Sequence, residues 1–166
     1  MIKLGKYDTE DLDGMRFVAR AIYKGKDRPP LRYIYVDGNE AMATDGHRLH
    51  IYQPEKDFQD GFYEVYKNTQ TMFWLERLAQ TEHLKFPEID WFFPNSFRWE
   101  YNLLGASVDG DYVKLSRRLH RGDGLNYQHF SDMVKGEPFV AHYAGLGKPV
   151  YFTNHTRYGL IMPFRV

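Results

Sequence analysis

The chain reads Ala43-Thr44-Asp45-Gly46-His47-Arg48-Leu49 in its first third and ends on Met162-Pro163-Phe164-Arg165-Val166. The Asp45-Gly46 pair stands between apolar residues, which is typical of a hairpin turn because glycine adopts positive φ without steric cost. The second stretch is typical of an apolar strand. Neither stretch alone specifies a function, but together they restrict the fold.

A third stretch lies between these two and reads Phe86-Pro87-Glu88-Ile89-Asp90-Trp91-Phe92-Phe93-Pro94. In this chain order, the three stretches resemble motifs of the bacterial DNA polymerase III beta subunit, the sliding clamp. In that family an ATDGHRL-type loop and an MPMRL-type C-terminus form two sides of a pocket that captures short peptides from polymerases and other clamp clients. An FPDYRRVLP-type linker between the second and third clamp domains adds the floor of the same pocket.

The resemblance implies an α+β protein with the DNA clamp fold, in which β-α-β-β-β units place their helices on one face of antiparallel sheets. With 166 residues the chain is long enough for a core but too short for a three-domain clamp subunit. We therefore expect a single reduced clamp-like domain over residues 1–166. Residues 1–53 would form its first β-α-β-β-β unit, residues 54–120 a shortened middle with the linker-like segment 86–94, and residues 121–166 a C-terminal α-β-β-β unit.

Hydrophobic periodicity predicts the elements of these units. The 3.6-residue spacing of Leu12, Met15 and Val18 indicates a helix that begins after Asp8 or Thr9. A second helix is expected from Asn68 or Thr69 through Ala79. The remaining expected elements are strands at residues 2–7, 31–36, 40–44, 47–53 and 62–67, a hairpin over 97–119 across Asp109-Gly110, a helix over 126–135, and closing strands at 138–144, 148–153 and 158–166.

By the resemblance, the peptide pocket has apolar walls, rigid edges and a polar rim. Its residues would be Thr44, Gly46, His47, Arg48, Leu49, Pro87, Trp91, Phe92, Met162, Pro163, Phe164 and Arg165. An apolar slot with few oriented polar groups suits a short extended peptide with Leu and Phe anchors, of the QLxLF kind. Trp91, Phe92 and Phe164 differ from the residues usual at these motif positions, and their bulk predicts a narrower slot that adapts less readily than one lined by Met.

A stripe of basic residues lies on the first expected helix. Arg16, Arg20 and Lys24 recur every four residues and would share one face, roughly opposite Met15. In the resembled clamps, helices line a central channel and their basic residues face the DNA backbone, so the resemblance implies non-specific contact with double-stranded DNA. A solvated helix face explains the same pattern, since Asp13 can pair with Arg16.

Composition restricts the other functional classes. The chain has 22 Lys and Arg against 22 Asp and Glu, so its bulk charge does not indicate a nucleic-acid or membrane partner. Cys is absent, which excludes disulfides and thiolate zinc sites. No stretch approaches membrane-spanning length or reads as a signal peptide, so we expect a cytoplasmic protein with no membrane partner. We expect no cofactor and no metal.

The resemblance therefore implies a non-enzymatic protein of DNA replication. Its partners would be the peptides of a DNA polymerase or of other clamp clients, and as a homo-oligomer it would encircle double-stranded DNA. An alternative of the same binding class is a decoy that competes with a true clamp for clients without holding DNA.

Two further alternatives are an enzyme and a second kind of binding protein. A metal-dependent nucleic-acid-modifying enzyme would use the acidic residues near the N-terminus, which are Asp8, Glu10, Asp11 and Asp13. Acidic residues at that place also favour a helix N-terminus through the helix dipole. A single-stranded nucleic-acid binder would stack bases on the aromatic residues Tyr33, Tyr35, Trp99 and Tyr101. Their positions on expected strands favour packing over stacking.

Overall fold

The computed structural model describes residues 1–135 and 137–166 and, at Trp91, the backbone alone. Its contacts divide the chain into two compact units, Met1–Pro87 and Glu88–Val166. The division falls inside the segment 86–94 that the sequence predicts as a linker. The expected subdivision at residue 53 stays a prediction, and strands that come after this residue pair with strands that come before it.

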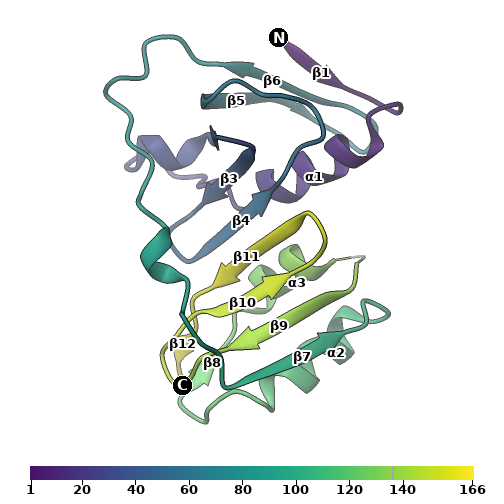
Figure 1. The fold of residues 1–166 in the computed structure, drawn as a ribbon, viewed down its shortest axis with the longest axis vertical. Coiled ribbons are helices and arrows are strands. Elements are labelled where there is room, and N and C mark those ends of the chain that lie inside the picture. The colour runs from purple at the N-terminus through teal and green to yellow at the C-terminus, as the bar shows by residue number, and fades with distance from the viewer. Residues whose placement is uncertain (136) are drawn as a thin grey trace. The chain divides into compact units, whose positions relative to one another are not determined.

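The first unit is an antiparallel sheet with helix α1 packed against it (Figure 1). Its strands follow the spatial order β1-β6-β5-β2-β3-β4. Apolar side chains of α1 at the predicted spacing, Leu12, Met15 and Val18, are buried, and the helix contacts β3, β4 and β6. The elements are β1 (Ile2–Leu4), α1 (Thr9–Ala19), a 3₁₀ turn (Pro29–Arg32), β2 (Ile34–Asp37), β3 (Glu40–Thr44), β4 (Arg48–Tyr52), β5 (Gly61–Asn68) and β6 (Phe73–Arg77).

The predicted helix from residue 69 to residue 79 is wrong, because residues 73–77 form strand β6. Phe73 and Leu75 alternate with polar or half-exposed neighbours, so these two side chains enter the core. The strand is hydrogen-bonded on both sides, to β1 and to β5. Thr69, which we expected to cap a helix, closes the β5–β6 turn instead, since its Oγ1 accepts a hydrogen bond from the Met72 N–H at 3.1 Å.

The second unit has a sheet with the strand order β11-β10-β9-β7 and a separate two-residue ribbon of β12 and β8. Helices α2 and α3 contact each other and lie on one face of that sheet (Figure 1). The elements are a 3₁₀ turn (Asp90–Phe92), β7 (Trp99–Leu103), α2 (Val108–Ser116), β8 (Asp123–Gly124), α3 (Tyr127–Val134), β9 (Phe139–Tyr143), β10 (Val150–Thr153), β11 (Arg157–Ile161) and β12 (Phe164–Arg165).

The predicted hairpin over residues 97–119 is wrong in its second half, which is helix α2. Ser107 caps this helix, because its side chain accepts a hydrogen bond from the Gly110 N–H at 3.1 Å. Asp109-Gly110 therefore lies in the first helical turn, where the helix dipole favours an acidic residue. Asp111 and Leu115, four residues apart, are the buried positions of the helix.

The α+β class and the placement of helices on one face of antiparallel sheets are confirmed. Helix α3 begins where predicted, with the Asn126 side chain accepting from the His129 N–H at 3.0 Å. The last predicted strand is divided, because β11 ends at Ile161 and Phe164–Arg165 leave the main sheet to pair with β8. Pro163 stands at the break and has no N–H for a ladder bond.

Candidate functional site

The turn between β3 and β4 is held by hydrogen bonds of its own residues. The Thr44 hydroxyl donates to the Arg48 carbonyl at 2.6 Å and accepts from the Gly46 N–H at 3.1 Å. The Asp45 carboxylate accepts from the His47 N–H at 2.9 Å and forms an ion pair with Arg48 at 3.1 Å. Gly46 takes φ of +93°, which explains the Asp-Gly pair in this turn.

Arg48 also anchors the turn to helix α1. Its Nη2 donates to the Arg20 carbonyl at 2.6 Å, at the C-terminal end of the helix, where the dipole favours a cation. Thr44, Arg48 and Leu49 are buried, whereas Gly46 and His47 are exposed. The predicted wall and rim residues of this turn are therefore held rigidly by these hydrogen bonds. Among them, His47 is exposed to solvent.

The C-terminal ribbon of the second unit is organised around a buried carboxylate. Asp123 on β8 accepts from the Tyr143 hydroxyl at 2.7 Å and from the Gly147 N–H at 2.8 Å. The Arg165 guanidinium on β12 lies 3.8 Å from the same carboxylate. Burial, followed by the hydrogen bond to Asp123, raises the pKa of Tyr143 to about 12. The carboxylate thus joins β8, β9, β12 and the loop between β9 and β10.

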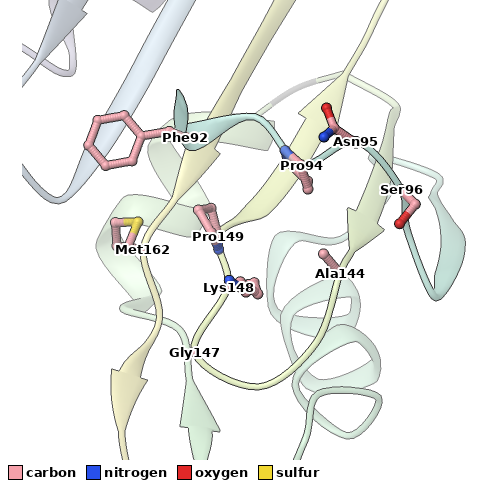
Figure 2. A pocket seen from close by; sticks show the side chains of 9 residues that line it. All are labelled: Phe92, Pro94, Asn95, Ser96, Ala144, Gly147, Lys148, Pro149 and Met162. Carbon is pink, nitrogen blue, oxygen red and sulfur yellow. The ribbon is translucent and has the colours of Figure 1, made fainter. Parts of the chain in front are cut away.

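A pocket of about 490 Å³ opens beside that loop (Figure 2). One side is the segment that follows the 3₁₀ turn, and the other is the β9–β10 loop with the residue after β11. Its lining residues are Phe92, Pro94, Asn95, Ser96, Ala144, Gly147, Lys148, Pro149 and Met162. Phe92, Pro94, Pro149 and Met162 supply apolar surface, while Asn95, Ser96 and Lys148 are polar, a combination suited to a ligand with an apolar anchor.

The pocket contains two of the residues predicted for peptide binding, Phe92 from the linker motif and Met162 from the terminal motif. Pro163 is half-buried outside the lining, and Phe164 and Arg165 are exposed on β12. Pro87 is exposed at the end of the first unit. The side chain of Trp91 lies outside what the structure describes. That the 44–49 turn borders the same pocket stays a prediction.

Sequence reasoning missed the lining that comes from the β9–β10 loop, Ala144 to Pro149. The Gly145-Leu146-Gly147-Lys148 run lacks the spacing of a phosphate-binding loop. The glycines serve the turn instead, with φ of +135° at Gly145 and +71° at Gly147. Gly145, Gly147 and Pro149 predict a turn at this place in the sequence, but they do not predict a pocket.

The three basic residues predicted to face DNA do not share one helical stripe. Helix α1 ends at Ala19, so Arg20 is its C-cap and Lys24 lies beyond it. Arg16 is half-buried, with Nη1 at 3.5 Å from the Gln70 carbonyl, whereas Lys24 is exposed. Their contact with DNA stays a prediction.

Two of the four acidic residues near the N-terminus, Asp8 and Asp11, have structural partners. Asp11 is buried and accepts from the Tyr52 hydroxyl at 2.9 Å and from the backbone N–H groups of Glu55 and Lys56. Asp8 accepts from the Gly5 N–H and pairs with Lys56. Over residues 1–135 and 137–166, no three His, Asp or Glu side chains gather in a group that could hold a metal ion.

The aromatic residues considered for base stacking pack against other side chains. Tyr35 stacks on Phe86 with ring centroids 4.9 Å apart, and Tyr33 meets Phe62 edge to face at 6.4 Å. Trp99 lies 5.2 Å from the ring of Tyr143. Tyr101 is covered by the Arg118 guanidinium at 4.2 Å. These contacts favour a packing role for the four rings.

No family sequence model matches the chain, and no curated protein sequence matches it significantly. Solved structures do. The beta chain of DNA polymerase III from Streptococcus pneumoniae has 15% sequence identity and a TM-score of 0.65, over 99% of this chain and 64% of that chain. This chain has the sliding-clamp fold. A further match to that fold is the Helicobacter pylori beta clamp bound to a DNA ligase peptide, with 13% identity and a TM-score of 0.64 over 92% of this chain and 62% of that one.

The Bacillus subtilis DNA polymerase sliding clamp also matches, with 12% identity and a TM-score of 0.60 over 99% of this chain and 64% of that one. The chain thus spans 62 to 64% of the length of these three clamps. At such low identity the likeness establishes the fold, and the earlier resemblance of the three motifs agrees with it. Among the described residues of this clamp fold, no helix has the length and apolar character that crossing a membrane requires.

Proposed function

We propose that the chain is a sliding-clamp-like protein of DNA replication that binds short clamp-interaction peptides of polymerase-type partners. The pocket lined by Phe92 and Met162 is the observation that carries this proposal, because both residues were predicted from motifs seventy positions apart. Its apolar lining suits Leu and Phe anchors of a QLxLF peptide. The Helicobacter pylori clamp, which has the same fold, was solved with a DNA ligase peptide.

Titration of a fluorescently labelled QLxLF peptide against the full chain tests the proposal. We expect saturable binding that a shortened chain lacking residues 162–166 loses, since the deletion removes Met162 and the β12 strand. The deletion also removes the Val166 N–H bond to the Gly122 carbonyl, so its folded state is checked by circular dichroism. Absence of binding to the full chain at millimolar peptide would contradict the proposal.

We further propose that the chain assembles as a homo-oligomer that encircles double-stranded DNA. The support is the clamp fold itself. Identical subunits close a ring through cyclic symmetry. The decoy alternative differs in one measurable property, because it binds client peptides as a monomer and does not retain DNA.

Solution mass, measured by light scattering over a range of protein concentration, separates these two functions. A mass that is a fixed multiple of the 19.7 kDa chain supports ring assembly. Retention on circular but not on linearised DNA would then show encirclement. A monomeric mass at high micromolar concentration, with peptide binding intact, would establish the decoy instead.

A further inference from the structure

The pocket of the second unit has a single type of charge in its lining. Among the described residues that line it, Lys148 alone is ionisable, and it is exposed. No ion pair joins Lys148 to a carboxylate over residues 1–135 and 137–166. Figure 2 shows Lys148 between Pro149 and Gly147 on the loop that faces the segment carrying Pro94. A ligand in this pocket therefore meets a cation beside apolar surface.

The backbone of Lys148 is held in place by the loop. Its N–H donates to the Gly145 carbonyl at 3.0 Å, which closes a turn, and the neighbouring Gly147 N–H donates to both oxygens of Asp123, at 2.8 and 3.1 Å. Gly147 needs its positive φ of +71° for this geometry. Because the turn is fixed at both points, the backbone from which the Lys148 side chain extends is held beside the apolar lining.

Two further cations lie along the same loop. A Cβ atom placed on Gly145 would be 3.3 Å from Nε of Arg98, and one placed on Gly147 would be 3.1 Å from Nη2 of Arg165. Both arginine side chains belong to exposed residues. The Asp123 carboxylate, 3.8 Å from the Arg165 guanidinium, is fully buried and already accepts hydrogen bonds from Tyr143 and Gly147. The loop thus presents a local excess of positive charge although the whole chain is neutral.

We propose that this pocket selects peptides that carry a carboxylate beside the apolar anchor, and that Lys148 determines the preference. The inference rests on the proposed peptide-binding function and adds the chemistry of its preferred ligand. The carboxylate can belong to an Asp or Glu side chain or to the C-terminus of the client. Pairing at an exposed rim is screened by salt, so the preference is largest at low ionic strength.

Three labelled peptides with the same QLSLF core distinguish these sources. The first ends in an amide and is neutral, the second has a free C-terminal carboxylate, and the third ends in an amide after two added Asp residues. We expect the wild-type chain to bind one or both acidic forms about twofold to fivefold more tightly than the neutral form at low salt, the size typical of an exposed ion pair. Whichever form gains affinity identifies the source of the carboxylate.

The variant Lys148→Gln should lose this ratio between acidic and neutral peptides, and Lys148→Arg should restore it. Lys114→Gln is the matched control, because Lys114 is an exposed cation on α2 that does not line the pocket. Equal affinity for all three peptides at low salt, or a ratio that survives in Lys148→Gln, overturns the inference and leaves peptide binding intact. Failure of every peptide to bind overturns both proposals.

Discussion

The Tyr143 hydroxyl donates a hydrogen bond to the Asp123 carboxylate at 2.7 Å, and both side chains are buried. Burial is the main cause that raises the pKa of Tyr143 to about 12, and the hydrogen bond adds to it. In an unfolded chain the same hydroxyl titrates near its ordinary value of about 10. The neutral phenol is therefore the form that the folded chain favours.

Stability should decline between about pH 10 and pH 12 because of this group. Below the unfolded pKa the contribution is fully present, and as pH rises through the folded pKa it is lost, since the unfolded chain releases the proton first. The difference between a pKa near 10 and one of about 12 corresponds to about 2 to 3 kcal/mol of stability. Urea unfolding from pH 8 to pH 12 measures the loss, and Tyr143→Phe should flatten the curve in this range. An unchanged slope in that variant would assign the decline to other groups.

Gly105→Ala should destabilise the chain strongly. Gly105 has φ of +75°, and an added Cβ would lie 2.7 Å from the backbone of Glu137. The left-handed conformation costs a side-chain residue about 1 to 2 kcal/mol, and the overlap with backbone atoms adds about 1 to 3 kcal/mol. Gly38→Ala is the matched control, because Gly38 has φ of +61° and no atom within 4 Å of an added Cβ. Comparable unfolding midpoints for the two variants would contradict the crowding at Gly105.

Truncation of a pocket wall should weaken peptide binding. Met162→Ala removes apolar lining, and we expect a loss of about 1 to 3 kcal/mol in binding free energy, the range of a buried anchor contact. Leu104→Ala is the control, because Leu104 is 73% exposed and does not line the pocket. Fluorescence anisotropy with the QLxLF peptide measures both. Equal affinity of Met162→Ala and the wild type would remove this pocket as the peptide site.

The predicted role of the β3–β4 turn needs a separate variant. Leu49→Ala should weaken peptide binding to a similar degree if the turn borders the site, as the family resemblance implies. Leu49 is only 2% exposed, so this substitution also costs core stability, about 2 to 5 kcal/mol. Binding is therefore compared only under conditions where circular dichroism shows the variant fully folded. Wild-type affinity in the folded variant would exclude the turn.

Charge reversal at Arg16, Arg20 and Lys24 should weaken association with double-stranded DNA and flatten its salt dependence. Loss of three phosphate contacts would reduce the slope of log affinity against log salt by about 3. A triple reversal at the exposed residues Lys6, Arg32 and Lys85 changes the net charge equally and serves as control. Equal effects of the two triple variants would assign the DNA contact to net charge alone.

Local signals in the sequence determined several elements without help from the rest of the chain. The spacing of Leu12, Met15 and Val18 specified helix α1, and Asn126 marked the start of α3 because its side chain satisfies a free backbone N–H. Asp45-Gly46 specified the β3–β4 turn, since the Asp side chain and the positive φ of Gly act within four residues. Interactions between residues this close along the chain can be predicted from the sequence alone.

Only the tertiary structure decided whether residues 73–77 form a helix or a strand. Leu75 belongs both to a helical spacing with Met72 and Leu78 and to a strand alternation with Phe73, so periodicity alone is ambiguous. Residues 73–77 form a strand because they pair with β1 on one side and with β5 on the other. The β1 partners lie more than sixty residues away in the sequence, so the stability of this pairing cannot be read from the local pattern.

The lining of the pocket likewise depends on the tertiary structure. The sequence singled out Phe92 and Met162 through their motifs, but the lining also needs Gly147 and Lys148, which no motif marks. Their position depends on the buried carboxylate of Asp123, whose hydrogen bonds hold the loop. A buried polar group is stable only where its partners meet it, and those partners come together only in the folded chain.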